Sequence, residues 1–312
     1  MEKLTLSTVI KENIEQLSIT EKKANNVIEN IRNNIKNYVK SNNIKSLIIG
    51  VSGGLDSSVV SALCQEKYTG VPLIGVSIPM NSTNEHKEQA KWIGENYCTV
   101  FEEFNEWDNT FNIYETNNTE SKETSINFIK EIFNTVSKTN SIAEKAGFNV
   151  NTFPTKILNG NIKARLRMIT LYDLARKTNG MVLSTDNLSE FNMGFWTICG
   201  DVGDYGPIQN IGKGFELPII AEQLNIRNDI IYQPPSDGLM VTEDNTDEAQ
   251  LGASYKEVDF IIKMYSNEFN YKINEFTKEE QDKINKIINR YENLTYKRKG
   301  TINLSRKIIN ID

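Results

Sequence analysis

The segment 52–58, which reads Ser-Gly-Gly-Leu-Asp-Ser-Ser, combines residue types that suit the binding of a polyphosphate. Its glycines allow a tight turn and a close approach of backbone amides to an anion, and its serines add hydroxyl donors. An apolar run over 47–51 precedes it and a helix is predicted over 57–66, so the loop would lie at a helix N-terminus, where anions bind. Asp56 would repel a bare polyphosphate, which implies that Mg²⁺ lies between this carboxylate and the phosphates of ATP.

The same segment argues against one common class of nucleotide site. A Walker A loop requires Gly-x-x-x-x-Gly-Lys-Ser/Thr, and the segment 52–58 contains no lysine. It resembles instead the Ser-Gly-Gly-x-Asp-Ser loop of the ATP pyrophosphatase family, which holds the pyrophosphate released when a substrate is adenylylated. An ordinary glycine-rich turn is the alternative. The agreement of strand, glycines, acid, hydroxyls and helix favours a phosphate site.

A second candidate carboxylate follows the predicted strand 181–184. In parallel α/β sheets, ligand contacts gather at the carboxyl ends of the strands, and Glu190 lies shortly after this one. Glu190 is therefore a candidate partner for Asp56 on the cation. The alternative is structural, because Asp186 or Asn187 would suit the cap of a helix that carries Glu190 in its first turn.

Basic residues mark two further segments. Lys163, Arg165 and Arg167 lie in the first turns of a predicted helix, where cations oppose the helix dipole unless an anionic ligand compensates. A solvated basic face is the alternative. Lys213 follows a glycine-rich loop over 200–206 and would neutralise phosphate as a point charge.

A turn-rich acidic loop over 233–248 precedes a helix predicted over 251–262. We expect the segment 234–248 to close over bound nucleotide as a lid. His86 is the only histidine and lies in a polar helix start, which argues against His-based catalytic triads and His metal sites.

Alternating strand and helix patterns predict an α/β fold, built on a doubly wound parallel sheet with helical appendages. Strands are predicted over 47–51, 73–78, 98–101 and 181–184, with helices over 57–66 and 84–96 between the first three. Apolar residues at helical spacing over 9–39 predict one or two further helices. The expected division is an N-terminal helical region, 1–44, an ATP pyrophosphatase-type domain, 45–260, and a C-terminal helical tail, 261–312. A polar insertion is expected near 105–158, with a helix near 124–137.

Composition restricts the class of protein. The 312 residues carry a net charge of −6 with an isoelectric point near 5.2, which gives no overall basic surface for nucleic acid. The chain lacks an apolar run of about 18 residues and a signal-peptide pattern, so we expect a cytoplasmic protein without a membrane partner. Cys64, Cys98 and Cys199 are odd in number and far apart, which predicts reduced thiols.

Several motifs occur in the order found in NAD synthetases, and this resemblance spans roughly residues 45–300. They are Gly50-Val-Ser-Gly-Gly-Leu-Asp-Ser57, Gly160-Asn-Ile-Lys-Ala-Arg-Leu-Arg-Met168, Ser184-Thr-Asp-Asn-Leu-Ser-Glu190, Gly194-Phe-Trp-Thr197, Gly200-Asp201, Asp247-Glu248 and Leu251-Gly-Ala-Ser-Tyr-Lys-Glu-Val-Asp259. The resemblance implies a Rossmann-like fold and a homodimer. It also implies a ligase that adenylylates the nicotinate carboxylate of deamido-NAD with Mg²⁺ and ATP. Ammonia would then displace AMP.

The resemblance also implies a role for each matching residue. ATP would contact Gly50, Val51, Ser52, Gly53, Gly54, Leu55, Asp56, Ser57, Thr185, Lys213 and Ser236. Mg²⁺ would be held by Asp56 and Glu190. Asp201 would face the ammonia and the acyl carbon, and Lys213 would offset charge on pyrophosphate, so both would act in catalysis. The deamido-dinucleotide would contact Arg165, Asp204, Tyr205, Tyr296 and Lys297.

The half of the site for the acyl substrate departs from the family pattern. Ile198 stands where the family usually has lysine, and Tyr296 stands where it usually has histidine. Either Asp204 or Tyr205 takes the last position of an acidic loop motif. Amidation of nicotinate mononucleotide is therefore the alternative function.

Two functions outside this class are disfavoured. A tRNA-modifying ATP pyrophosphatase would be expected to show a basic or aromatic-rich surface or paired cysteines. A nucleotide sensor without catalysis would be expected to lack Asp56, Glu190 or Lys213, which are all present. The chain offers no room for a glutaminase domain of the usual size, so free ammonia is the expected nitrogen donor. A separate amidotransferase subunit is the alternative.

Overall fold

The structure is a computed structural model that describes residues 3–80, 82–104, 132, 138–149, 155–236 and 246–300. The helix expected near 124–137 lies almost entirely outside these residues, as does most of the expected insertion. The middle of the expected lid, 237–245, also lies outside them. Along the described part of the chain, no helix is both long and apolar enough to cross a lipid bilayer.

A parallel sheet of four strands lies at the centre of the larger part of the molecule. The strands are β1 (Leu47–Gly50), β2 (Leu73–Ser77), β3 (Val100–Glu103) and β4 (Met181–Val182), in the spatial order β3-β2-β1-β4. Leu47 of β1 pairs with Leu73 on one side and with Met181 on the other. Ile48 and Ile49 are fully buried because helices cover both faces of this central strand. The prediction of a parallel α/β sheet is confirmed, although β3 begins later than expected.

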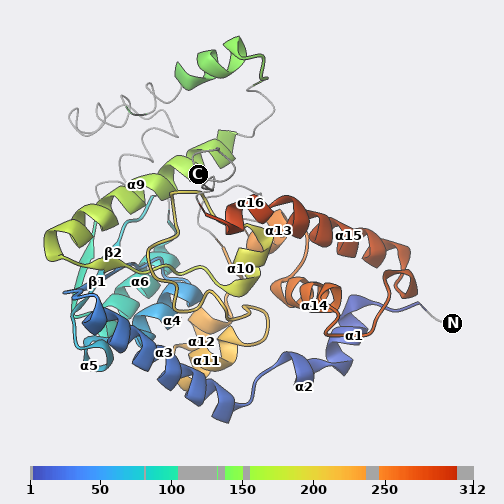
Figure 1. Cartoon of the computed structure of the whole chain (residues 1–312), viewed down its shortest axis with the longest axis horizontal. Helices are drawn as coiled ribbons and strands as arrows, with labels where there is room; N and C mark the ends of the chain where they lie inside the picture. The colour runs from blue at the N-terminus through green and yellow to red at the C-terminus, as the bar shows by residue number, and fades with distance from the viewer. Residues whose placement is uncertain are drawn as a thin grey trace, which may run out of the picture.

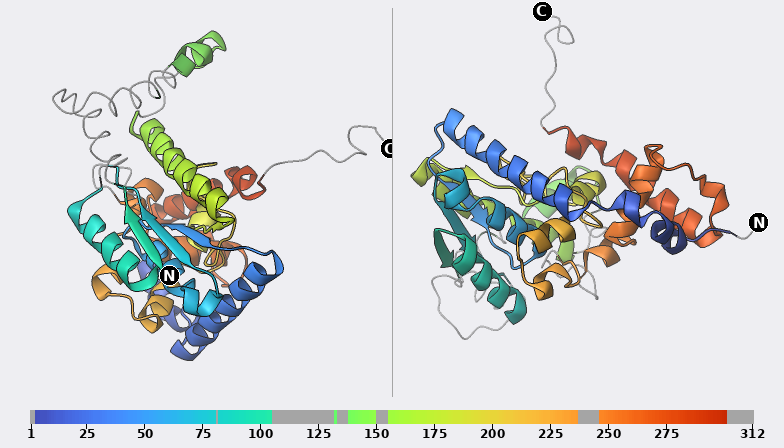
Figure 2. Two further views of the ribbon diagram at one scale, coloured as in Figure 1. Left: turned by 90° about the vertical axis from the view of Figure 1, so that its left-hand side faces the viewer. Right: turned by 90° about the horizontal axis from the view of Figure 1, so that it is seen from below.

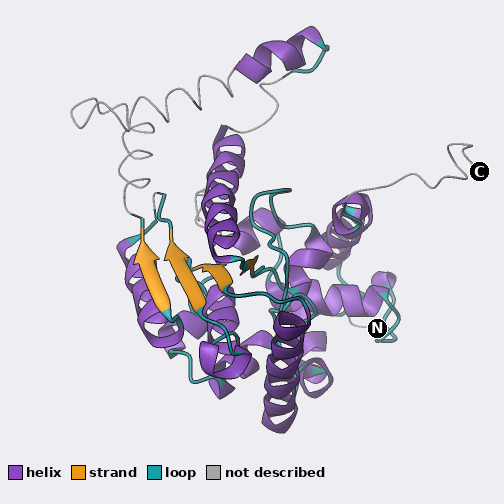
Figure 3. Ribbon diagram, turned by 60° about the vertical axis from the view of Figure 1, so that its left-hand side comes forward, coloured by secondary structure: helices purple, strands orange, loops and turns teal. Residues whose placement is uncertain are grey.

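Helices on both faces make the sheet doubly wound (Figure 3). On one face, a hydrophobic cluster with Leu47 and Ile49 is formed by α3 (Glu21–Ser41), α4 (Leu55–Leu63), α6 (Asn84–Tyr97) and α11 (Leu217–Gln223). On the other face, α9 (Thr155–Thr178) packs with Ile48 and Val182. After β3 the chain crosses to the far side of β1, so the strand order reverses between β1 and β4. Such a switch point opens a crevice beyond the carboxyl ends of the two strands.

A group of helices beside the sheet surrounds a second hydrophobic cluster (Figures 1 and 2 show the helices). It joins α1 (Leu6–Glu12) and α2 (Ile14–Leu17) to α13 (Asp247–Leu251), α14 (Tyr255–Tyr265) and α15 (Lys278–Asn293). Leu4 pairs with Phe276, which is fully buried. The N-terminal region therefore forms three helices, of which only α3 contributes to the cluster on the sheet. Helices from near both ends of the described chain, α1 and α15, thus share one core.

Two helices near the crevice differ from the sequence prediction. α4 begins at Leu55, before the predicted 57–66, so Asp56 lies inside its first turn. The helix predicted over 251–262 is two helices, α13 and α14, because Gly252 adopts a φ of 75° and ends α13. Short helices also include α5 (Glu66–Thr69), α10 (Leu188–Met193), α12 (Asn228–Ile231), α16 (Thr295–Arg298) and a 3-10 turn at Ile273–Glu275.

The basic segment of α9 is also different from expectation. α9 begins at Thr155, so Lys163, Arg165 and Arg167 lie within the helix, beyond the reach of its N-terminal dipole. Lys163 is buried and Arg165 is exposed. Arg167 donates through Nε to the carbonyl oxygen of Ile78 at 3.1 Å. The three cations therefore form neither one anion site at a helix start nor one solvated face.

Candidate active site

The loop between β1 and α4 has the geometry of an anion cradle. Gly53 adopts a φ of 89°, and a Cβ there would lie 2.3 Å from the carbonyl oxygen of His86. Glycine is therefore required by conformation and by space. Among the described residues no side chain caps α4 at Gly54, which leaves its first-turn amides to a ligand. The hydroxyl oxygens of Ser52 and Ser57 lie 3.1 Å apart beside these amides.

A cavity of about 750 Å³ opens at the switch point, beyond the ends of β1 and β4. Its volume is in the range of small-molecule sites. It brings together most of the residues predicted to bind ATP, the metal and ammonia. These lining residues are Gly50, Val51, Ser52, Gly54, Leu55, Asp56, Ser57, Thr185, Glu190, Asp201, Lys213 and Ser236. Gly53 lies in the same loop, where its carbonyl oxygen accepts a hydrogen bond from Gln233 at 3.3 Å.

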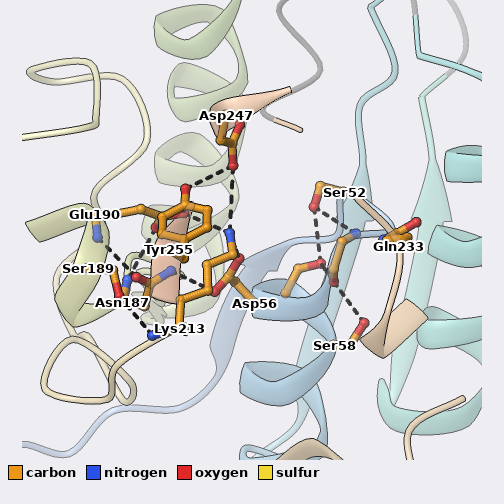
Figure 4. A network of polar contacts seen from close by, with 12 residues as sticks. Ser52, Asp56, Ser58, Asn187, Ser189, Glu190, Lys213, Gln233, Asp247 and Tyr255 are labelled. Atoms are coloured by element: carbon orange, nitrogen blue, oxygen red, sulfur yellow. Dashed lines mark hydrogen bonds and ion pairs between the residues drawn. The ribbon is translucent and has the colours of Figure 1, made fainter. Parts of the chain in front are cut away.

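The Lys213 ammonium lies at the centre of an acidic cluster (Figure 4). Its Nζ is 2.9 Å from Asp56 Oδ2 and 3.0 Å from Glu190 Oε1. Asp247 Oδ2 lies further away, at 3.7 Å. The ring of Tyr255 packs against the ammonium, 4.5 Å from Nζ to the ring centroid. Its hydroxyl donates to Asp247 Oδ2 at 2.9 Å, and the same hydroxyl oxygen lies 3.3 Å from Glu190 Oε1. Side chains from α4, α10, α13 and α14 thus meet at one positive charge.

The cap of α10 orients Glu190 toward this cluster. Asn187 Oδ1 accepts the N–H of Glu190 at 3.0 Å, and Glu190 Oε2 accepts the N–H of Asn187 at 3.3 Å, which forms a capping box. The second carboxylate oxygen of Glu190 remains for Lys213. Asn187 Nδ2 also donates to Asp56 Oδ1 at 2.9 Å. The two interpretations of this segment, a helix cap and a functional site, therefore apply to the same side chains.

Burial and unequal charge make the cluster electrostatically strained. The side chains of Lys213, Glu190 and Asp247 are 9%, 14% and 3% exposed. Burial raises the pKa of Glu190 to about 8, against the opposing attraction of Lys213. Burial also disfavours the ammonium of Lys213, but the three carboxylates outweigh it and raise its pKa. With Asp56, the ionised cluster holds three negative charges and one positive charge, and a divalent cation would offset the excess.

The acids of this cluster fit Mg²⁺ bound together with a nucleotide. Asp56 and Glu190 contact the same ammonium, so their carboxylates converge, and oxygen ligands are those that Mg²⁺ prefers. Within the described residues, no group of three or more His, Cys, Asp or Glu side chains forms a complete metal cage. Protein sites for Mg²⁺ usually supply one or two carboxylates and leave the other positions to water and substrate phosphates.

Asp201 lies on the wall of the cavity, near α9. The backbone N–H of Thr197 donates to both of its carboxylate oxygens, at 2.8 and 3.1 Å. Asp201 is an exposed residue that lines the cavity, yet the surrounding protein partly desolvates its carboxyl group. This desolvation raises the pKa of Asp201 to about 7, against the hydrogen bonds from Thr197. A carboxylate that titrates near neutral pH suits proton transfer.

The residues expected to contact the acyl substrate do not line the cavity. They are Arg165, Asp204, Tyr205, Tyr296 and Lys297. Asp204 accepts hydrogen bonds from the Tyr172 hydroxyl at 2.8 Å and from the backbone N–H of Val182 at 3.2 Å. Tyr205 packs on Tyr38 of α3, with ring centroids 5.0 Å apart. Both residues lie in a stretch that runs beside β4, so their side chains stabilise the edge of the sheet.

The cations of this set bond backbone carbonyls beside Asp201. Arg165 Nε donates to the carbonyl oxygen of Ile198 at 3.2 Å. Lys297 Nζ donates to the carbonyl oxygens of Gly194, at 2.5 Å, and Trp196. These bonds fix the loop after α10, which carries Trp196 into the cavity. Tyr296 is 55% exposed.

Asp247, Tyr255 and Asn187 complete the acidic cluster, although the sequence assigned none of them a ligand or catalytic role. Asp247 and Tyr255 fall within motifs that resemble NAD synthetases, which was the available signal. Asn187 was visible as a candidate cap. Their contacts with Lys213, Glu190 and Asp56 join segments far apart in the chain, and no local pattern encodes such contacts.

We expect Lys213→Met to destabilise the protein, because it leaves three buried carboxylates without their counter-ion. The free energy of unfolding should fall by about 3–5 kcal/mol, as for other broken buried pairs. The loss should be larger at pH 8 than at pH 6. Because the pKa of Glu190 is raised to about 8 in the folded state, the protein loses stability as the pH rises from the ordinary range of a carboxyl group, where the unfolded chain ionises, through about 8. Removing the ammonium strengthens this effect.

Denaturant unfolding at both pH values measures these losses. Lys283→Met is the matched control, because Lys283 also pairs with a carboxylate, Glu257 at 2.8 Å, but is 29% exposed. It should cost no more than about 1 kcal/mol at either pH. Equal losses in the two variants would contradict the assignment of Lys213 as the counter-ion of the cluster.

Comparison with known proteins places the chain in a family. A family model described as NAD synthase matches residues 27–301. The chain is 31% identical over 241 residues to an NH(3)-dependent NAD(+) synthetase of Methanocaldococcus jannaschii, covering 77% of this chain and 80% of that protein. It is 31% identical over 291 residues to one of Sulfurisphaera tokodaii, covering 92% and 91%. The fold also matches a solved structure titled as NMN synthetase from Francisella tularensis, with a TM-score of 0.66 and 23% identity over 92% of this chain and 99% of that one. The loop 52–58, called the phosphate loop below, and the acidic cluster around Lys213 thus lie in a chain that belongs to the NAD synthase family.

Proposed function

We propose that this protein is an ammonia-dependent NAD synthetase, a ligase that forms a carbon–nitrogen bond at the expense of ATP. The observation that carries the proposal is the Lys213 ammonium, held by Asp56 and Glu190 at the mouth of the phosphate loop, in one cavity with Asp201. The chain covers 80% and 91% of two relatives that bear this name. The proposed reaction converts deamido-NAD to NAD and releases AMP and pyrophosphate.

The first half-reaction activates a carboxylate. The nicotinate carboxylate attacks the α-phosphorus of ATP, and pyrophosphate leaves. The segment 52–57 binds the departing phosphates through amides and hydroxyls, and Lys213 offsets the charge that develops on them. Mg²⁺ bound to Asp56 and Glu190 would neutralise phosphate charge and orient the leaving group. Lys213 is free to serve the phosphates once a divalent cation takes its place on the two carboxylates.

The second half-reaction forms the amide. Ammonia attacks the acyl carbon, and AMP leaves. Asp201 is proposed to accept a proton from the incoming nitrogen, because its carboxyl group has a pKa of about 7 and lines the cavity. The Thr197 N–H holds both of its oxygens in place.

Nicotinate mononucleotide is the second candidate substrate. Ile198 and Tyr296 are 47% and 55% exposed, and they stand where the family usually has lysine and histidine near the dinucleotide. The mononucleotide carries fewer phosphates, so it needs fewer cations. In this structure the N–H groups of Arg165 and Lys297 donate to backbone carbonyl oxygens. Both side chains would therefore have to move before they contact either substrate.

The proposal includes a homodimer. α9 exposes four large side chains to solvent, which are Ile157, Leu158, Ile169 and Tyr172, and Ile169 is 65% exposed. A second copy related by a two-fold axis would cover such a face.

We expect Asp56→Asn and Glu190→Gln each to lower kcat by on the order of 100-fold or more, because each removes a proposed ligand to Mg²⁺. The rate is measured as AMP release with ATP, Mg²⁺, ammonium and deamido-NAD. Asp282→Asn is the matched control, since Asp282 pairs with Lys278 on the exposed surface of α15. Rates within threefold of wild type in both cluster variants would sink the metal assignment.

The nitrogen donor gives a second prediction. The purified chain should use ammonium and should not use glutamine, and its rate should rise from pH 6 to pH 8.5. Two effects act in the same direction, because more NH₃ is present and because Asp201 is ionised above about pH 7. Asp201→Asn should lower kcat about 100-fold and leave only the rise due to NH₃. Glutamine turnover comparable to ammonium turnover would contradict the proposed donor.

Position 198 provides a test of substrate choice. Ile198→Lys should raise the ratio of kcat/KM for deamido-NAD to that for nicotinate mononucleotide about 5- to 100-fold, since an added cation would contact the phosphate that only the dinucleotide carries. Ile142→Lys, at a position that is 66% exposed and outside the α9 face of the proposed dimer, is the control for a general charge effect. An unchanged ratio would show that position 198 does not select the substrate.

A further inference from the structure

The loop that carries Lys213 is held by a buried carboxylate outside the cavity. Asp259 lies on α14, one turn after Tyr255, and is 7% exposed. Its Oδ2 accepts the N–H of Gly214 at 2.9 Å, and its Oδ1 accepts the hydroxyl of Ser189 at 2.5 Å. The Ser189 oxygen accepts the N–H of Lys213 at 2.8 Å. Two successive amides of the loop are therefore bound to one carboxylate, directly or through one hydroxyl.

Tight packing prevents this loop from moving toward α14. A Cβ at Gly212 would lie 2.8 Å from Asp259 Oδ2, and a Cβ at Gly214 would lie 2.8 Å from the backbone of Lys256. Both distances are too short for a real side chain, so glycines flank Lys213 to allow this close approach. The N–H of Gly212 is bound as well, by Glu216 at 2.8 Å.

A packing role alone does not explain an acid at position 259. An unpaired carboxylate is costly to bury, and apolar side chains fill such positions without this cost. Desolvation raises the pKa of Asp259 to about 6, against the hydrogen bonds from Ser189 and Gly214. The group is nevertheless ionised at neutral pH, and its negative charge strengthens both bonds. Asp259 therefore provides a charged hydrogen-bond acceptor at the position that fixes the backbone of Lys213.

We propose that Asp259, acting through Ser189 and Gly214, is a positioning residue that holds the Lys213 ammonium where charge develops on pyrophosphate. The proposal rests on the proposed function, since Lys213 is assigned there to the leaving phosphates. α14 would set the position of Lys213 twice, through the backbone by Asp259 and through the ammonium by the ring of Tyr255. Asp259 does not line the cavity, so it acts only through other residues.

Kinetics of Asp259→Asn and Ser189→Ala test this proposal, with each change made in the wild-type chain and in a Lys213→Met background. In the wild-type chain, kcat should fall about 10- to 100-fold, because a small misplacement of a catalytic group has effects of this size. The KM for ATP should change less than about threefold, since the phosphate loop is untouched. In the Lys213→Met background, neither change should lower kcat by more than about twofold, because the ammonium that they position is gone.

Glu257→Gln is the matched control. Glu257 lies on α14, as Asp259 does, and its carboxylate pairs with Lys283 and not with the loop that carries Lys213. The kcat of the Glu257→Gln variant should therefore stay within about twofold of wild type. Equal further losses of kcat in the two backgrounds would show that Asp259 acts on overall structure, and would overturn the proposal.

Hydrogen exchange at the amides of Lys213 and Gly214 gives a readout that needs no activity. Asp259→Asn should raise both exchange rates at least about tenfold, and Glu257→Gln should not. Unchanged exchange would overturn the proposal. If the wild-type chain amidates neither nicotinate nucleotide, the proposed function fails, and the exchange rates still decide whether Asp259 fixes the loop.

Discussion

The ion pairs of the Lys213 ammonium are the interaction on which the rest of the site depends. Asp56, Glu190 and Asp247 are carboxylates within reach of one Nζ atom, and little solvent reaches the cluster. Their mutual repulsion at these positions would be costly without the ammonium. Because Asp56 belongs to a helix packed on the sheet and Asp247 to a helix of the second hydrophobic cluster, the ammonium also joins the two cores of the molecule.

The cluster around Lys213 has an excess of negative charge, which would favour the binding of a divalent cation together with a nucleotide. Three carboxylates and one ammonium attract a divalent cation, and a cation on Asp56 and Glu190 would release Lys213 toward the phosphates. Binding energy of Mg²⁺ and ATP would then be spent on placing a positive charge where it is needed in the transition state. The repulsion among the carboxylates would be reduced when the charged ligands bind, as suits a ligase with several charged substrates.

Two helices, α10 and α14, position the side chains of the site, and each supplies more than one contact. The capping box of α10 uses one oxygen of Glu190 for the helix and leaves the other for the cluster, while its Asn187 reaches Asp56. α14 carries Tyr255 and Asp259 one turn apart, so one helix contacts both the ammonium and the loop behind it. Side chains on helix termini with fixed hydrogen bonds hold a geometry better than side chains on free loops.

The sequence by itself determined the features that depend on local pattern. The apolar run before Gly50, the alternation of strands and helices, and the glycines and serines of the phosphate loop each express a periodicity or a conformational requirement that neighbouring residues carry. They predict the parallel sheet and place Asp56 and Glu190 at the ends of strands. The role of Lys213 toward phosphate is implied by the resemblance to NAD synthetases, since its local pattern alone indicates only a cation after a glycine-rich loop.

Only the tertiary structure decided how distant segments meet. It joined α1 and α15 in one core, it turned Asp204 and Tyr205 toward the edge of the sheet, and it gave the Lys297 ammonium to backbone carbonyls. It also brought Asp247 beside Lys213. Contacts of this kind depend on how helices pack against the sheet, because packing sets the distance and direction between side chains, and no spacing along the chain contains that information.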